Sequence, residues 1–187
     1  MIDVDDSSLH KHGLDPRDFL ATDPWGKKVK VQPKIPAVIL SDPKYAHNLG
    51  QTVRALSCFG VGQLWWTGQR VIKALEGMDR IPREERMKGY QDVQIVHTER
   101  PLDPYEGMRG VTPVAVELRD NAEDLIYFEH PENAVYVFGP EDGSIHQGTL
   151  HACHRFVRIP TRHCTNLSAA VYLVLYDRAA KMARKAL

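Results

Sequence analysis

Short apolar runs separated by amphipathic stretches recur along most of the chain. They lie at residues 36–41, 62–68, 91–98, 111–118, 133–139 and 155–160, and the strongest are apolar nearly throughout, as in strands buried on both faces. Apolar residues at helical spacing follow at 47–59 and at about 166–185, and 144–151 can form a further short helix. Strands separated by helices predict an α/β fold, with a mostly parallel sheet flanked by helices.

The first 34 residues have a different character. They are polar, contain three prolines, and change from acidic to basic at Lys27, Lys28 and Lys30. We expect residues 1–34 to form a polar N-terminal arm and residues 35–187 to form a single domain. The basic stretch is either a strip that contacts RNA or a solubilising tail.

Composition excludes several classes of protein. The 43% of hydrophobic and 26% of charged residues are globular values, which argue against a disordered or fibrous chain. No run of eighteen apolar residues is present, and the acidic, polar start is unlike a signal peptide, so we expect a soluble cytoplasmic protein without a membrane association. The three cysteines, Cys58, Cys153 and Cys164, are predicted to be reduced thiols, most of them buried.

The zero net charge conceals a separation of charges along the chain. Residues 101–150 carry ten acids and two bases, whereas residues 151–187 carry one acid and seven bases. Such segregation favours a basic face that could bind a polyanion. The alternative is a final helix whose C-terminal lysines and arginines are favoured by the helix dipole.

Ligands of parallel α/β sheets bind beyond the carboxyl ends of the strands, so the loops there are candidate sites. In the first, Asn48 stands near a helix start, where its amide could cap the helix, and Arg54 follows in the helix. The planar guanidinium of Arg54 could bind a phosphate, although a surface arginine on an amphipathic helix is the simpler interpretation when this residue is taken alone.

The second candidate loop follows the strand at 133–139. Gly139 and Gly143 would permit a ligand to approach the backbone, and Glu141 could accept from a hydroxyl or an amine. The spacing is not that of a dinucleotide-binding loop, and an ordinary strand-to-helix turn is the alternative.

The third candidate loop opens the last helix with Thr165, Asn166 and Ser168. Free backbone N–H groups and hydroxyls suit a polar or anionic ligand, while plain helix capping accounts for part of the cluster. A metal site is a further alternative, with His151, Cys153, His154, His163 and Cys164 as potential ligands. Their spacing matches no common zinc pattern, so we expect no metal.

Taken together, the three segments resemble, in order, the three motifs of the SpoU (TrmH-like) branch of the SPOUT superfamily of RNA ribose 2'-O-methyltransferases. The N-x-G-x-x-x-R motif runs from Asn48 to Arg54, the F-G-x-E motif begins at Phe138, and the last motif extends over 159–171. The closest similarity is to small single-domain members that act on tRNA. This chain departs from the pattern at Cys164, where the family has serine, at Thr161, where it has methionine, and by one residue fewer before Gly143.

The resemblance implies a C-terminal trefoil knot, a homodimer, and S-adenosyl-L-methionine as cofactor. It implies cofactor binding by Val116, Glu117, Leu118, Gly139, Gly143, Ile159, Cys164, Thr165 and Leu167. It also implies catalytic roles for Arg54, Asn48, Glu141 and Asn166, in which Asn48 and Glu141 orient Arg54 or the loops. The expected substrate is RNA, with tRNA favoured over rRNA. The alternatives are an rRNA-directed methyltransferase and a knotted RNA-binding protein with weak or no activity.

Overall fold

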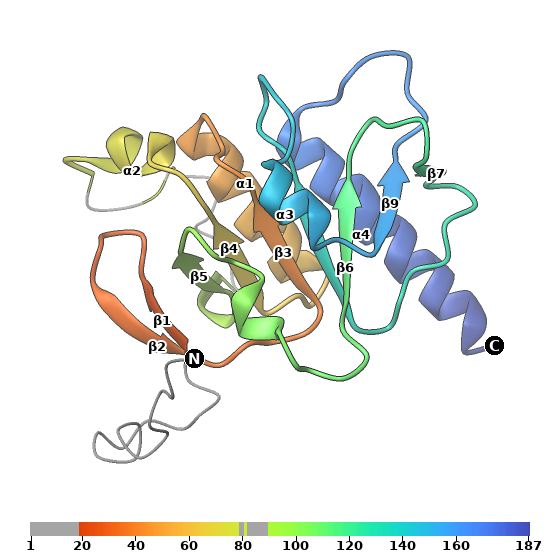
Figure 1. The fold of residues 1–187 in the computed structure, drawn as a ribbon, viewed down its shortest axis with the longest axis horizontal. Helices are drawn as coiled ribbons and strands as arrows, with labels where there is room; N and C mark the ends of the chain where they lie inside the picture. The colour runs from red at the N-terminus through yellow and green to blue at the C-terminus, as the bar shows by residue number, and fades with distance from the viewer. Residues whose placement is uncertain (1–18, 79–80, 82–89) are drawn as a thin grey trace, which may run out of the picture.

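The computed structural model describes residues 19–78, 81 and 90–187. In this part of the chain nine strands form one sheet in the order β2-β1-β5-β4-β3-β8-β6-β9-β7 (Figure 1). The strands are β1 (Phe19–Thr22), β2 (Lys28–Val31), β3 (Ala37–Leu40), β4 (Gln63–Trp66), β5 (Gln94–His97), β6 (Thr112–Val116), β7 (Glu123–Asp124), β8 (Ala134–Phe138) and β9 (Arg155–Arg158). The helices are α1 (Ala46–Cys58), α2 (Arg70–Leu75), α3 (Gln147–His151) and α4 (Leu167–Lys185), with the 3-10 helices η4 (Tyr90–Asp92) and η5 (Asp103–Tyr105).

The prediction of an α/β fold with a mostly parallel sheet is confirmed. Every pair from β5 across to β7 is parallel, and only β1 pairs antiparallel, with both of its neighbours. Each of the six apolar runs contains an observed strand. The short β7 was not predicted, because its two residues are both acidic and carry no hydrophobic pattern.

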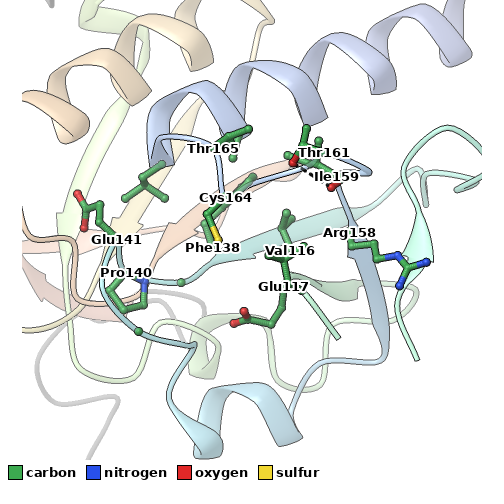
Figure 2. A pocket seen from close by; sticks show the side chains of 15 residues that line it. Val116, Glu117, Phe138, Pro140, Glu141, Arg158, Ile159, Thr161, Cys164 and Thr165 are labelled. Atoms are coloured by element: carbon green, nitrogen blue, oxygen red, sulfur yellow. Dashed lines mark hydrogen bonds between the residues drawn. The ribbon is translucent and has the colours of Figure 1, made fainter. Parts of the chain in front are cut away.

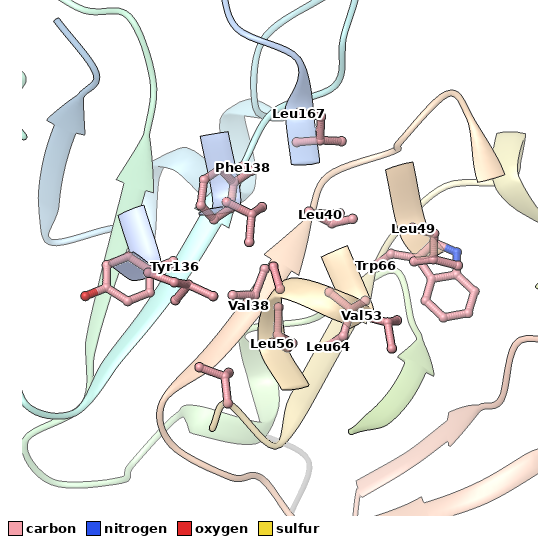
Figure 3. Packing of buried hydrophobic residues seen from close by; sticks show 14 of the residues in the cluster. Val38, Leu40, Leu49, Val53, Leu56, Leu64, Trp66, Tyr136, Phe138 and Leu167 are labelled. Carbon is pink, nitrogen blue, oxygen red and sulfur yellow. The ribbon is translucent and has the colours of Figure 1, made fainter. Parts of the chain in front are cut away.

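The sheet separates two hydrophobic clusters. In β3, Val38 and Leu40 face one cluster, while Ala37 and Ile39 face the other, as the alternation of side chains in a strand requires. The first cluster is shared with the apolar stripes of α1 and α4, which pack side by side on that face of the sheet (Figure 3). In the described residues, no helix is long and apolar enough to cross a bilayer.

Part of the segment expected to be a polar arm belongs to the sheet. Within residues 1–34, β1 and β2 form a hairpin that extends the sheet beyond β5. Alternation explains this, because Ala21 and Val31 are buried in the second cluster while Lys28 and Lys30 are exposed. Residues 1–18 lie outside the described part of the chain, and the boundary at residue 35 stays a prediction.

A buried histidine links the sheet to the last helix. The His130 imidazole bonds through Nε2 to the Asp177 carboxylate at 2.8 Å, and through Nδ1 to the Tyr136 hydroxyl at 2.7 Å. A carboxylate can only accept, so Nε2 carries the proton and Nδ1 of the neutral ring accepts from Tyr136. Burial lowers the pKa of His130, with smaller contributions from Lys181 and Arg178, and outweighs the opposing effect of Asp177.

This arrangement predicts an acid-sensitive fold. As the pH falls from about 6.5, the unfolded chain binds a proton at residue 130 before the folded chain does, so stability present above that pH is progressively lost. We expect the free energy of unfolding in urea to decrease between pH 7 and pH 5, and His130→Gln to reduce that decrease. The exposed control His151→Gln should keep the wild-type pH dependence. An unchanged pH dependence in His130→Gln would contradict the assignment.

Candidate functional site

A pocket of about 150 Å³ opens beyond the carboxyl ends of β6, β8 and β9 (Figure 2). These strands are adjacent and parallel, so the loops that follow them converge. The lining residues are Val116, Glu117, Leu118, Phe138, Gly139, Pro140, Glu141, Gly143, Arg158, Ile159, Thr161, Cys164, Thr165, Leu167 and Ala170. All nine residues expected to bind the cofactor lie among them; that they bind it stays a prediction.

Sequence reasoning did not select five of the lining residues. Phe138, Pro140 and Arg158 are next to selected positions, and Thr161 and Ala170 lie within the last motif, so the available signal was their closeness to the motifs. The end of each strand contributes consecutive residues to the pocket, whereas a sequence motif specifies only some of those positions.

The floor of the pocket is closely packed around Gly139. A Cβ atom at this position would lie 3.2 Å from the Ile145 backbone nitrogen and 3.4 Å from Glu117 Oε2. The Ile145 N–H donates to that same carboxylate oxygen at 3.1 Å. Gly139 therefore lets Glu117 join the end of β6 to the loop after β8, and a larger residue would have to displace one of them.

One chain of hydrogen bonds joins the three motifs. Asn48, which is 1% exposed, donates from Nδ2 to Glu141 Oε1 and accepts at Oδ1 from Asn166 Nδ2 at 2.9 Å. Glu141 Oε2 also accepts from the Lys44 backbone N–H at 2.8 Å. The helix start, the pocket loop and the start of α4 are therefore held together through the buried amide of Asn48.

This network corrects the expectation that Asn48 caps α1. The helix begins at Ala46 after Tyr45, and the Asn48 side chain turns to Glu141 rather than to the free N–H groups of the helix. Asn166 caps the last helix, as the capping alternative predicted, and also bonds to Asn48, while its catalytic role stays a prediction. Its Oδ1 caps α4 by accepting from the N–H groups of Ser168 and Ala169, and its Nδ2 reaches Asn48.

Arg54 is not brought into this network. It lies exposed on α1, does not line the pocket, and makes no hydrogen bond or ion pair within the described part of the chain. Asn48 and Glu141 therefore hold the loops, and no hydrogen bond or ion pair joins them to Arg54. Burial raises the pKa of the neighbouring Tyr172, and the charge of Arg54 opposes that rise.

A group of charged residues beside the pocket was missed from the sequence. Asp142 accepts from Arg70 at 2.8 Å and pairs with Lys44 at 3.2 Å, and Arg70 also pairs with Asp42 at 3.0 Å. These hydrogen bonds, that with Arg70 foremost, lower the pKa of Asp142. Gly68 must lack a side chain here, because a Cβ atom would overlap the Asp42 carboxylate. No sequence motif indicates these pairs, since they join two separate loops and the start of α2.

The candidate metal ligands are dispersed. No group of three or more His, Cys, Asp or Glu side chains in the described residues is arranged to hold a metal ion. All three cysteines are free thiols, but only Cys153 is buried, and burial raises its pKa to about 12. Cys58 and Cys164 are exposed, which corrects the expectation that most of the thiols are buried.

Comparisons with known proteins agree with this geometry. The chain is 26% identical to the tRNA (cytidine-2'-O-)-methyltransferase TrmJ of Methanocaldococcus jannaschii, over 79% of this chain and 69% of that protein. The TrmH/SpoU tRNA modifying enzyme of A. aeolicus superposes with a TM-score of 0.67 and 19% identity, over 82% of this chain and 78% of that one.

The SpoU methyltransferase AviRb of Streptomyces viridochromogenes, solved with AdoMet, superposes with a TM-score of 0.63 and 16% identity, over 84% of this chain and 68% of that one. At these identities the two solved structures establish a shared fold. The model of the SpoU rRNA Methylase family matches residues 36–176, which include all three motifs and the pocket. The chain therefore belongs to the SpoU rRNA Methylase family, and the resemblance found in its sequence is confirmed.

Proposed function

We propose that this protein transfers a methyl group from S-adenosyl-L-methionine to a ribose 2'-hydroxyl of RNA, with tRNA as its substrate. The observation that carries the proposal is the convergence of the three family motifs on one pocket, tied by the hydrogen bonds of Asn48 with Glu141 and Asn166. The relative named as a tRNA 2'-O-methyltransferase and the related fold solved with AdoMet support the substrate and the cofactor.

The lining of the pocket is compatible with this cofactor. Phe138, Leu118 and Ile159 offer apolar surface, the Glu117 carboxylate can accept from an amine or hydroxyl, and Gly139 permits close approach to the backbone. S-adenosyl-L-methionine supplies an electrophilic methyl group on its sulfonium. The protein's contribution is to hold that group rigidly, which the network around Asn48 would do by fixing the loops.

Arg54 is assigned to the RNA. Its guanidinium stays protonated in proteins, so it cannot serve as the base that removes the 2'-hydroxyl proton. It can hold the adjacent phosphate and stabilise the negative charge that develops on the 2'-oxygen. Its exposure and its lack of a partner within the described residues leave it available for that contact.

The proposal extends to assembly and location. We infer a homodimer whose C-terminal chain forms a trefoil knot, as the family resemblance implies, and a cytoplasmic location, as expected from the composition of the chain. On α4, Leu173 is 41% and Tyr176 is 65% exposed, although the helix packs against α1. A second subunit on this face would cover both residues. Arg54, which lies on α1 and outside its own pocket, would then stand near the subunit interface.

Calorimetry with S-adenosylhomocysteine tests the cofactor site. We expect one site per chain, unaffected by a chelator. Gly139→Val should weaken binding roughly tenfold or more, about 1.4 kcal/mol, because its side chain displaces Glu117 or Ile145. Cys164→Ser, which restores the family residue, should retain binding. Absence of heat at millimolar ligand would overturn the enzyme proposal and favour an RNA-binding protein without activity.

The substrate and the dimer need separate measurements. Mass spectrometry of nucleosides from tRNA and rRNA, from cells with and without the gene, should show a ribose methylation lost from tRNA. Loss from rRNA alone would favour the rRNA-directed alternative.

Light scattering should give twice the mass of the chain. Affinity for tRNA should fall steeply with salt, because phosphate contacts release counterions. A fully active monomer, or binding indifferent to salt, would contradict the model. Further positive charge is expected from a basic loop that lies outside the described residues, with Arg80, Arg83, Arg86 and Lys88.

A further inference from the structure

The hairpin of β1 and β2 lies outside the matched family region of residues 36–176, and none of the described residues buries its outer face. Its inner face packs on the second hydrophobic cluster through Phe19, Ala21 and Val31. The register places Leu20 opposite Lys30 and Thr22 opposite Lys28, so these residues share the outer face. Leu20 is 61% exposed there.

The turn of this hairpin presents a tryptophan to solvent. Trp25 is 51% exposed, while the neighbouring Pro24 is buried. The Asp23 carboxylate accepts from the backbone N–H groups of Trp25 at 3.0 Å and Lys27 at 2.9 Å, and Gly26 supplies the positive φ of 80° that closes the turn. The indole is therefore exposed on an ordered backbone, with little conformational entropy left to lose on binding.

Unpaired cations accompany the indole. Lys27 and Lys28 are exposed and form no ion pair with any described residue, whereas Lys44, Lys181 and Lys185 are each paired with a carboxylate. Asp23, the one acid within 19–34, is already occupied by the turn. The tip of the hairpin thus combines an aromatic plane with two lysines that pair with no carboxylate of the described residues.

We propose that this hairpin is an RNA-contacting surface, in which Trp25 stacks on an unpaired base while Lys27 and Lys28 contact the flanking phosphates. Proteins bind single-stranded RNA with aromatic side chains beside cations, because each base can stack on an aromatic ring and each phosphate linkage carries a negative charge. The inference rests on the proposed function, and it adds a contact for the substrate outside the matched family region.

The position of the hairpin in the sheet suits a single RNA. Four strand spacings separate β1 from β8, so the hairpin stands about 19 Å from the strand that leads into the pocket. The outer face of the hairpin is opposite the second cluster, and is therefore on the side of the sheet that α1 and Arg54 occupy. An RNA bound at Arg54 could extend across the sheet to Trp25.

The test compares binding of unfractionated tRNA and of a 12-nucleotide oligouridylate by fluorescence anisotropy. Trp25→Ala should weaken both roughly 5- to 100-fold, and Trp25→Phe should recover most of the loss. Lys27→Gln with Lys28→Gln should reduce the slope of log affinity against log salt by about 1.5. Tyr127→Ala, another exposed aromatic, and Lys73→Gln, another exposed cation, should change neither quantity.

The outcomes separate this inference from the proposed function. Wild-type affinity in Trp25→Ala, with intact methyl transfer, would overturn the hairpin surface and leave the enzyme standing. Absence of S-adenosylhomocysteine binding in the wild type would instead remove the enzyme, whatever the hairpin does. If Trp25→Ala loses affinity for phosphatidylserine vesicles but keeps the wild-type affinity for RNA, the hairpin is a lipid-binding surface, and the proposed RNA contact is overturned. Unchanged melting temperature and cofactor affinity in the variants would exclude misfolding as the cause of weaker RNA binding.

Discussion

Replacing Arg54 by alanine should reduce methyl transfer at least about 100-fold while leaving S-adenosylhomocysteine affinity nearly unchanged. The structure predicts this separation, because Arg54 lies outside the pocket and makes no hydrogen bond or ion pair within the described residues. Removing the Arg54 side chain therefore breaks no hydrogen bond or ion pair among these described residues. It does remove the cation that stabilises the negative charge developing on the 2'-oxygen. Single-turnover kinetics with saturating cofactor, and calorimetry on the same preparation, measure the two quantities.

Arg54→Lys separates two roles of the arginine. If the planar fork of donors holds a phosphate, a point charge at the same place restores little of the rate. If only the field of a positive charge matters, lysine should restore most of it. The exposed control Lys73→Ala removes one positive charge from α2 and should leave the rate unchanged. Turnover close to wild type in Arg54→Ala would place the catalytic cation elsewhere.

The parallel core of this fold could be predicted because it depends on local pattern. Runs such as AVIL and AVYVF are apolar at every position, so they predict strands buried on both faces, which a parallel sheet requires. The hairpin at 19–31 was harder to predict. Its apolar positions alternate with lysines over only four residues, and the deciding contact is the packing of Phe19 against Trp65, 46 positions away.

The site shows the same division between local and distant information. Motif letters identified Asn48, Glu141 and Asn166, and the structure joins them, although their mutual bonds cross 93 and 118 residues of sequence. The pairs of Arg70 with Asp42 and Asp142 have no counterpart in the motifs. Arginine and aspartate are ordinary surface residues, and only the convergence of two loops with the start of α2 makes them neighbours. The sequence therefore indicated three residues that meet beside the pocket, but not the charged pairs that surround them.

Asn48→Asp should be the most destabilising of the substitutions considered. The change replaces the amide Nδ2 that donates to Glu141 by a carboxylate oxygen, so two like charges face each other at a position that is 1% exposed. Asn48 is buried and Glu141 is only partly exposed, so water screens the pair weakly, and at pH 8 we expect a loss of about 3 kcal/mol in the free energy of unfolding. Asn166 would still donate to the new carboxylate, but one hydrogen bond cannot offset a buried charge.

The pH dependence distinguishes this repulsion from a simple loss of packing. A proton shared between the carboxyl groups of residues 48 and 141 would restore the missing donor, so the folded variant binds a proton at higher pH than the unfolded chain does. Its deficit relative to wild type should therefore shrink as the pH falls from 8 to 5. Asn133→Asp, the same change at an exposed position, should alter stability by no more than about 0.5 kcal/mol. If the loss of unfolding free energy in Asn48→Asp is the same at every pH, the Asn48 amide fills space without holding Glu141. The variant should then lose cofactor affinity only to the extent that it unfolds.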